Sequence, residues 1–187
     1  MYYVLECFSS LMQNSAAISE CPEIEGVESW LTGSIINTNI AQPIKLELDP
    51  NSPGEMLEMY QLEMTIMSDR LINTLIEFGV NNLQVYDAII SDPNTGTEFR
   101  NYKVVNVIGI ISCADLSKSI FKSSGSIPLI DVDFESLQID ELRTHGLQIF
   151  RLAECISAII IDENVKNFLL EKGFENLTFK DPIEFIG

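Results

Sequence analysis

Hydrophobic positions recur every three to four residues in two stretches of the chain, residues 68–79 and 162–173. This spacing is typical of a helix that turns one face toward a protein core. Each stretch begins with a side chain that can accept a hydrogen bond from the first helical turn, and each ends with a glycine suited to a left-handed cap. These end residues are Ser68, Gly79, Asp162 and Gly173. The pattern predicts two helices.

Other stretches have the patterns of β-strands. Residues 60–66 alternate between apolar and polar and predict a half-buried strand, whereas residues 156–161 are apolar almost throughout and predict a fully buried one. Residues 89–99 contain a cluster of turn-forming residues and predict a hairpin. The long β-branched run at residues 102–112 is the expected central strand.

Two shorter stretches, residues 128–134 and 147–152, also have strand patterns. Polar or turn-rich composition predicts loops at residues 13–29, 49–55 and 117–126. The chain length of 187 residues fits one domain. We therefore expect a single α+β domain over residues 1–187, with about seven strands and two main helices.

Two segments resemble each other at a constant offset of 94 residues, 68–86 and 162–180. Each reads as a helix preceded and followed by a strand, so the expected fold contains two similar strand–helix–strand units. Six identical positions between the two segments are explained equally by duplication of one segment and by independent convergence on the same economical motif. The identical pairs are Asn73/Asn167, Leu75/Leu169, Glu77/Glu171, Gly79/Gly173, Asn82/Asn176 and Leu83/Leu177.

The charge balance is the outlying feature of the composition. There are 28 acidic and 11 basic residues, a net charge of −17, and residues 1–66 alone hold ten acids and one base. Such a field repels nucleic acid and anionic membrane surfaces, and it speeds the encounter with a basic partner. Solubility alone is the other explanation of the same excess.

The start of the chain lacks a basic segment, and no apolar run is long enough to span a membrane. These observations predict a cytoplasmic protein. Because that compartment is reducing, we expect reduced thiols at all four cysteines, which are Cys7, Cys21, Cys113 and Cys155.

Catalytic motifs are missing from the sequence. The single histidine, His145, follows Arg143-Thr144 and precedes a glycine at an expected turn, where a solvated surface side chain is typical. No nucleophile frame, glycine-rich phosphate loop or paired metal-ligand motif accompanies it. We predict no catalytic residue, no metal ligand and no cofactor.

One carboxylate cluster has strand spacing: Asp131, Asp133 and Glu135 project from one face, with Val132 and Phe134 between them. The glycine that a calcium loop requires is missing. Three readings remain open, which are a solvated strand face, a docking patch for a basic partner and a metal site.

A second acidic cluster surrounds the only tryptophan. Glu23, Glu25 and Glu28 precede Trp30 within a few residues. A lone tryptophan is most often part of the core, which we favour, because it buries a large area. Beside several carboxylates it is also a candidate interface anchor. These four residues, with the cluster at 131–135, are the candidate partner-binding residues.

Several segments together resemble a known family, namely residues 30–33, 67–71, 102–115, 149–152 and 159–166. The most specific is Tyr102-x-x-Val-Asn-Val followed by Asp115. Their order is similar to immunity protein family eleven of bacterial polymorphic toxin loci. The resemblance implies a non-enzymatic protein that binds and neutralises a cognate toxin, and it implies no catalytic residues.

Three functions follow from these observations. The first is an immunity protein whose acidic surface suits a basic toxin. The second is a small hydrolase or transferase with an unrecognised site, which a deep pocket holding a nucleophile and a base would favour. The third is a scaffold or regulatory subunit without a toxin partner.

Overall fold

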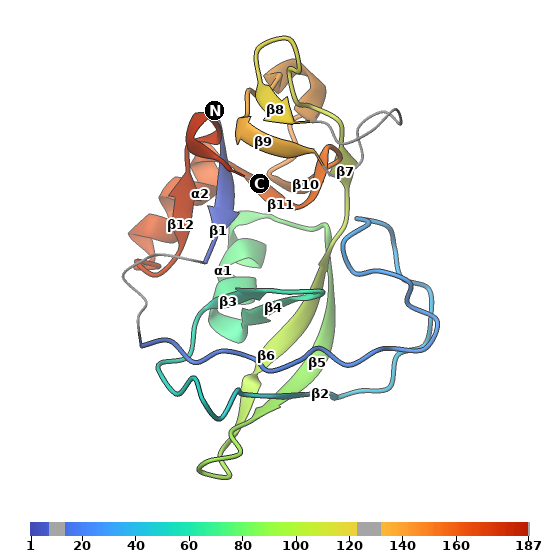
Figure 1. Cartoon of the computed structure of the whole chain (residues 1–187), viewed down its shortest axis with the longest axis vertical. Helices are drawn as coiled ribbons and strands as arrows, with labels where there is room; N and C mark the ends of the chain where they lie inside the picture. The colour runs from blue at the N-terminus through green and yellow to red at the C-terminus, as the bar shows by residue number, and fades with distance from the viewer. Residues whose placement is uncertain (8–13, 123–131, 187) are drawn as a thin grey trace.

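The computed structural model covers residues 1–187 and describes all of them except 8–13, 123–131 and 187. The described chain forms a single α+β domain with two α-helices (Figure 1), as the sequence predicts. Its strands form two five-stranded sheets and one two-stranded sheet.

The first sheet joins the two ends of the chain. Its strands, in spatial order, are β12 (Thr178–Lys180), β1 (Tyr2–Glu6), β11 (Cys155–Asp162), β10 (Ile149–Leu152) and β7 (Ile110–Ile111). Neighbouring strands are antiparallel except for β10 and β7, which are parallel. The predicted strands at 156–161 and 147–152 are therefore confirmed as β11 and β10.

The second sheet contains the predicted hairpin. Its strands, in spatial order, are β2 (Ile44–Glu47), β5 (Leu83–Ser91), β6 (Glu98–Val107), β4 (Thr65–Ser68) and β3 (Met59–Gln61). The hairpin consists of β5 and β6, and β6 lies at the centre of the sheet as expected.

The remaining elements are short or helical. The third sheet pairs β8 (Ile120–Lys122) with β9 (Asp133–Ser136). The helices are α1 (Asp69–Phe78) and α2 (Glu163–Glu171), with 3₁₀ turns η1 (Glu141–Thr144) and η2 (Pro182–Glu184).

Both α-helices begin at the predicted caps. The side chains of Ser68 and Asp162 each accept from the backbone N–H three residues further on, at 3.0 and 2.7 Å. The glycines beyond the two helices, Gly79 and Gly173, have φ values of 111° and 78°. The helices also contact each other, because the rings of Phe78 and Phe168 lie 5.2 Å apart.

The two similar segments adopt the same pairing scheme. In one, β4 leads through α1 to β5, and β6 lies between these strands and antiparallel to both. In the other, β11 leads through α2 to β12, and β1 lies between them and antiparallel to both. A hairpin partner, β3 or β10, flanks the first strand of each unit. In the first unit the strand in the middle is β6, which follows β5 along the chain. In the second unit the strand in the middle is β1, which comes from the N-terminus.

Burial on both faces explains the continuous apolar run of β11. Ile159 and Ile161 belong to the main core, which fills the space between the two large sheets and the helices. Ala158 and Ile160 point the opposite way, into a second core shared with Phe134 of β9. A strand that faces two cores has no solvent side and so loses the apolar/polar alternation.

The expected number of about seven strands was wrong, since the described chain has twelve. Residues 60–66 are not one strand: they turn at Leu62, whose N–H donates to the carbonyl of Met64 at 3.2 Å, and so belong to the β3–β4 hairpin. Alternation persists through this tight turn and conceals it. No strand was predicted at the positions of β1 and β2.

Two other expectations need correction. The run at 102–112 leaves the second sheet after Val107 and joins the edge of the first as β7, because Gly109 adopts a φ of 112° that redirects the chain. The expected loop at 117–126 contains β8, a three-residue strand with too few positions for a pattern. The expected strand at 128–134 falls mostly outside the described residues, and β9 covers its end.

Candidate partner-binding site

The loop that carries Trp30 is held against the junction of the two large sheets by a contact between two glycines. Gly109 donates its backbone N–H to the carbonyl of Gly33 at 2.8 Å. A β-carbon on Gly33 would lie 2.9 Å from the backbone of Gly109. Gly33 also has a φ of 64°, so both the conformation and the close approach require glycine.

Side chains of the second sheet fix the rest of this loop. Gln84 exchanges two hydrogen bonds with the backbone of Ile36, at 2.8 and 3.1 Å. Asn106 donates to the carbonyl of Ser34 at 2.8 Å. Within the loop, the hydroxyl of Thr38 donates to the carbonyl of Gly26 at 2.8 Å. Residues 26–38 therefore form a closed loop with defined attachments.

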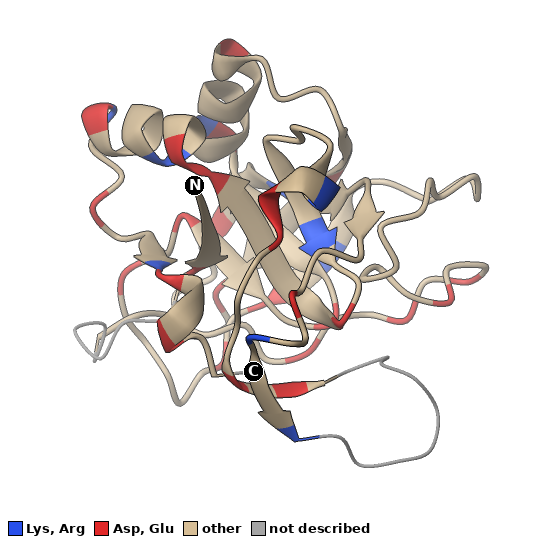
Figure 2. Ribbon diagram, turned by 90° about the horizontal axis from the view of Figure 1, so that it is seen from above, with Lys and Arg blue, Asp and Glu red and all other residues tan. Residues whose placement is uncertain are grey.

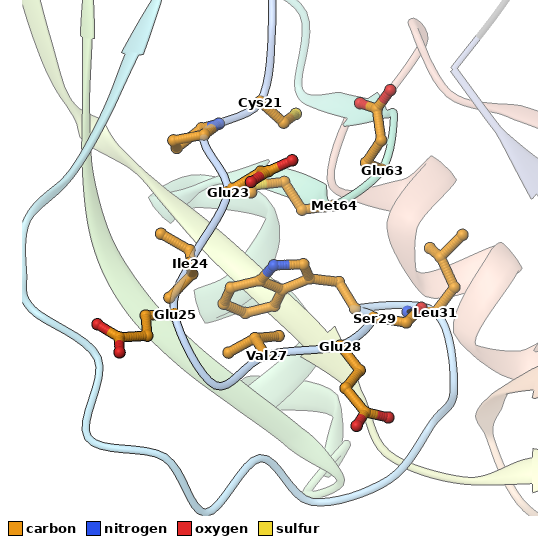
Figure 3. A pocket seen from close by; sticks show the side chains of 12 residues that line it. Cys21, Glu23, Ile24, Glu25, Val27, Glu28, Ser29, Leu31, Glu63 and Met64 are labelled. Atoms are coloured by element: carbon orange, nitrogen blue, oxygen red, sulfur yellow. Dashed lines mark hydrogen bonds between the residues drawn. The ribbon is translucent and has the colours of Figure 1, made fainter.

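This loop, the residues 21–25 just before it and the β3–β4 turn line a hollow of about 720 Å³, which we call the Trp30 hollow. Its lining is shown in Figure 3 and consists of Cys21, Pro22, Glu23, Ile24, Glu25, Val27, Glu28, Ser29, Trp30, Leu31, Glu63 and Met64. Trp30 is only 5% exposed and packs edge-on against Tyr86 of β5, with ring centroids 5.4 Å apart. The prediction that Trp30 belongs to the core is confirmed.

The indole N–H of Trp30 has no hydrogen-bond acceptor within the part of the chain that the structure describes. Among the described residues, the buried side-chain N and O atoms without a partner are Nε of Arg151 and Oε2 of Glu154, so the Trp30 N–H is a donor that solvent can reach. It remains open to an acceptor that enters the hollow.

Four exposed carboxylates line the same hollow: Glu23, Glu25, Glu28 and Glu63. None of them belongs to the ten ion pairs formed among described residues. Burial, and after it the nearby carboxylate of Glu63, raises the pKa of the Cys21 thiol to about 11. The hollow thus combines an apolar base with uncompensated negative charge.

The second predicted cluster is placed elsewhere in the fold. Asp133 and Glu135 are exposed on β9 with Phe134 buried between them, which confirms that these two carboxylates share one face. Glu135 forms an ion pair with Lys122 of β8 at 2.6 Å, and Asp133 lies opposite Lys122 in the register. Asp131 lies outside the described residues. β9 packs on the second core, whereas Trp30 belongs to the main core, so the clusters form two separate surfaces.

Acidic residues outnumber basic ones along the ribbon. Figure 2 shows Asp and Glu on loops, helices and strand ends around the molecule, with few Lys and Arg between them. Most basic side chains of the described chain are engaged by carboxylates, for example Lys103 with Asp69 and Asp87 at 3.2 and 3.4 Å. Because such pairs consume the few bases, the carboxylates of the Trp30 hollow remain without a counter-charge.

The remaining candidate residues take ordinary positions. His145 is exposed and ends η1 with a φ of 53°, as expected for a turn. No disulfide joins the four cysteines, as predicted. Within the described ranges no three His, Cys, Asp or Glu side chains are grouped so that they could hold a metal ion. No described helix has both the length and the apolarity to cross a membrane.

Two contributors to the hollow, Glu63 and Met64, were missed from the sequence. They lie in the stretch that was read as a continuous strand, so nothing indicated that the chain turns there toward Trp30. Tyr86 was likewise part of a strand pattern without a sign of its partner. Only the pairing of β3 with β4 places this turn against the loop.

The Trp30 hollow combines a closed loop, a concave surface with an apolar base and carboxylates without an ion-pair partner among the described residues. The sequence matches the Immunity protein family (Imm11) over residues 8–183, nearly the whole chain. The chain belongs to this family. Immunity proteins of polymorphic toxin systems are non-enzymatic and have a cognate toxin as their partner, as the resemblance implied. No curated protein matches the sequence.

Proposed function

We propose that this protein neutralises its cognate toxin by tight binding in the cytoplasm of the producing cell, and that the toxin is a basic protein. The family match over residues 8–183 carries the first part of the proposal. The net charge of −17 supports the second part, because a strongly acidic protein attracts a basic one and repels nucleic acid and anionic membranes.

The proposed partner-binding residues are those of the two acidic clusters. Glu23, Glu25, Glu28 and Trp30 contribute the contact surface of the Trp30 hollow. Asp131, Asp133 and Glu135 contribute charge that steers the encounter. Exposed charges at the rim of an interface mostly change the association rate, whereas a desolvated aromatic anchor mostly changes the dissociation rate.

Co-expression tests the neutralisation. The gene of a candidate cognate toxin is expressed from an inducible promoter, with and without this protein. We expect growth arrest only without it. Arrest that persists when both proteins are made in full amount would contradict the proposal, and a catalytically inactive toxin controls for the burden of expression.

Stopped-flow mixing tests the steering. Neutralising Asp131, Asp133 and Glu135 together should slow association with the toxin by roughly tenfold at low salt, with a smaller change in dissociation. The wild-type association rate should also fall as salt shortens the Debye length. If the association rate changes neither with the substitutions nor with the salt concentration, these carboxylates serve solubility only.

A further inference from the structure

The Trp30 hollow combines three properties that bear on binding. It is concave, with a volume of about 720 Å³, inside the range of roughly 300–1,000 Å³ that is typical of ligand sites. Glu23, which lies just before the closed loop, and Glu63, from the β3–β4 turn, line it from two separate segments. Trp30 presents an indole N–H that has no acceptor within the described chain.

The shape of the hollow favours a peptide over a small ion. A second hollow of about 360 Å³ adjoins it and shares Val27, Glu28 and Ser29 as lining residues. The same loop therefore lines both hollows. Ile35, which is 59% exposed, lines the second hollow and offers an apolar contact there. A single cation would fill only a small part of the Trp30 hollow.

The chemistry favours arginine within that peptide. A guanidinium group is planar and weakly hydrated, offers five donors and pairs with carboxylates in a fixed geometry. Its aliphatic stem packs on apolar side chains such as Ile24 and Met64 while its head reaches the carboxylates. Neither Lys nor Arg has an acceptor for the indole N–H, so that acceptor must be a carbonyl of the peptide backbone.

We infer that the Trp30 hollow receives an arginine-bearing loop of the toxin. The guanidinium group of this loop bridges Glu23 and Glu63, and a backbone carbonyl of the same loop accepts from the indole N–H of Trp30. This inference rests on the proposed function, since it names the surface and the chemical group through which the toxin is recognised.

Trp30 is the only tryptophan of the chain, so its fluorescence reports on the hollow directly. The first experiment titrates the full chain with the capped peptide Gly-Arg-Gly-Arg-Gly, and with Gly-Glu-Gly-Glu-Gly as a control. We expect a saturable change in fluorescence with the arginine peptide only. The double variant Glu23→Gln/Glu63→Gln should lose this response.

The matched control is Glu175→Gln/Glu184→Gln. Both of these glutamates are exposed, neither forms an ion pair in the described chain, and the change in net charge is the same. This control should respond like the wild type. No response in the wild type, or equal losses in both double variants, would overturn the inference, since the second result identifies a general charge effect.

The second experiment measures binding to the toxin. Glu23→Gln/Glu63→Gln should weaken binding by roughly tenfold or more relative to the Glu175→Gln/Glu184→Gln control. Trp30→Phe, which keeps an aromatic ring but removes the N–H, should weaken binding several-fold. Thermal unfolding of each variant checks that it folds.

The two proposals fail in different ways. If the toxin binds the Glu23→Gln/Glu63→Gln variant as tightly as the control, the hollow is not the contact surface, although the protein still neutralises its toxin. If the wild type does not bind the toxin at all, the proposed function fails, whatever the arginine peptide does.

Discussion

Arg151 of β10 donates a 2.9 Å hydrogen bond from Nη2 to the hydroxyl of Thr65 of β4, and this bond links the two large sheets through the core. Arg151 is 1% exposed, forms no ion pair in the described chain, and leaves its Nε without a partner. A second bond runs from Nη1 to the carbonyl of Ile156 at 3.0 Å. Burial lowers the pKa of Arg151 to about 10, because the charged form loses its hydration.

A double-mutant cycle tests this link. Thr65→Val leaves a buried guanidinium donor without an acceptor, so it should lower the free energy of unfolding by about 1–3 kcal/mol. Arg151→Met exchanges a buried charge for an apolar side chain and should be neutral or stabilising. Urea denaturation provides the measurement. In the Arg151→Met background, Thr65→Val should cost much less, and an equal cost in both backgrounds would show that the hydrogen bond is irrelevant.

Gly33→Ala should destabilise the protein more than Gly96→Ala. Both glycines have a positive φ, 64° and 72°, so alanine strains the backbone similarly at either position. They differ in space: a β-carbon at Gly33 would lie 2.9 Å from the Gly109 backbone, whereas nothing lies within 4 Å at Gly96. The overpacking should add about 1–3 kcal/mol, measured by chemical denaturation. Equal costs would show that the loop moves away freely.

Gly33→Ala should also change the Trp30 fluorescence, because the displaced loop carries the tryptophan. Gly96→Ala lies in the β5–β6 turn and should leave the emission unchanged. Steady-state spectra of the two variants, recorded under native conditions, provide the comparison. Unchanged emission in Gly33→Ala would mean that the contact with Gly109 does not position the hollow.

Alkylation under denaturing, non-reducing conditions should label all four cysteines, because none is in a disulfide. Under native conditions Cys21 should react first, since Cys7, Cys113 and Cys155 are buried. The reaction at Cys21 should also be slow near neutral pH and accelerate as the pH approaches 11, because its pKa is raised to about 11. Mass spectrometry counts the labels, and a protein labelled at two positions after denaturation would contradict this prediction.

Alkaline pH should destabilise the fold through buried groups that resist ionisation. Burial raises the pKa of Cys113 and of Tyr60, each to about 12. In the unfolded chain these groups ionise near their ordinary pKa values, so the unfolded state releases protons that the native state still holds. The stabilisation that they provide is complete below pH of about 9 and is lost as the pH rises toward 12.

The control for this prediction is Cys113→Ala, compared with the wild type in urea at several pH values between neutral and pH of about 10.5. The variant should be less stable at neutral pH, because it loses buried contacts. Its stability should nevertheless fall less steeply with pH. Parallel pH profiles for the two proteins would show that Cys113 does not contribute.

Local sequence patterns were sufficient to predict the two α-helices, the β5–β6 hairpin and the strands β10 and β11. Ser68 and Asp162 cap their own helices three residues away, and the turn between β5 and β6 closes over six residues, so these features depend only on neighbouring residues. The acidic clusters and Trp30 were equally visible, because charge and residue type need no fold. The family was recognisable from segments such as 102–115 for the same reason.

Tertiary structure decided where strands break and which segments meet. The run at 102–112 divides between two sheets at Gly109, because Gly33, 76 positions earlier, approaches its backbone. The alternation at 60–66 conceals a turn that brings Glu63 beside the Trp30 loop. The buried Arg151 finds a hydrogen-bond acceptor in Thr65, which lies on the other large sheet. Each of these features arises from contacts between residues far apart along the chain, and such contacts leave no periodic trace in the sequence around either partner.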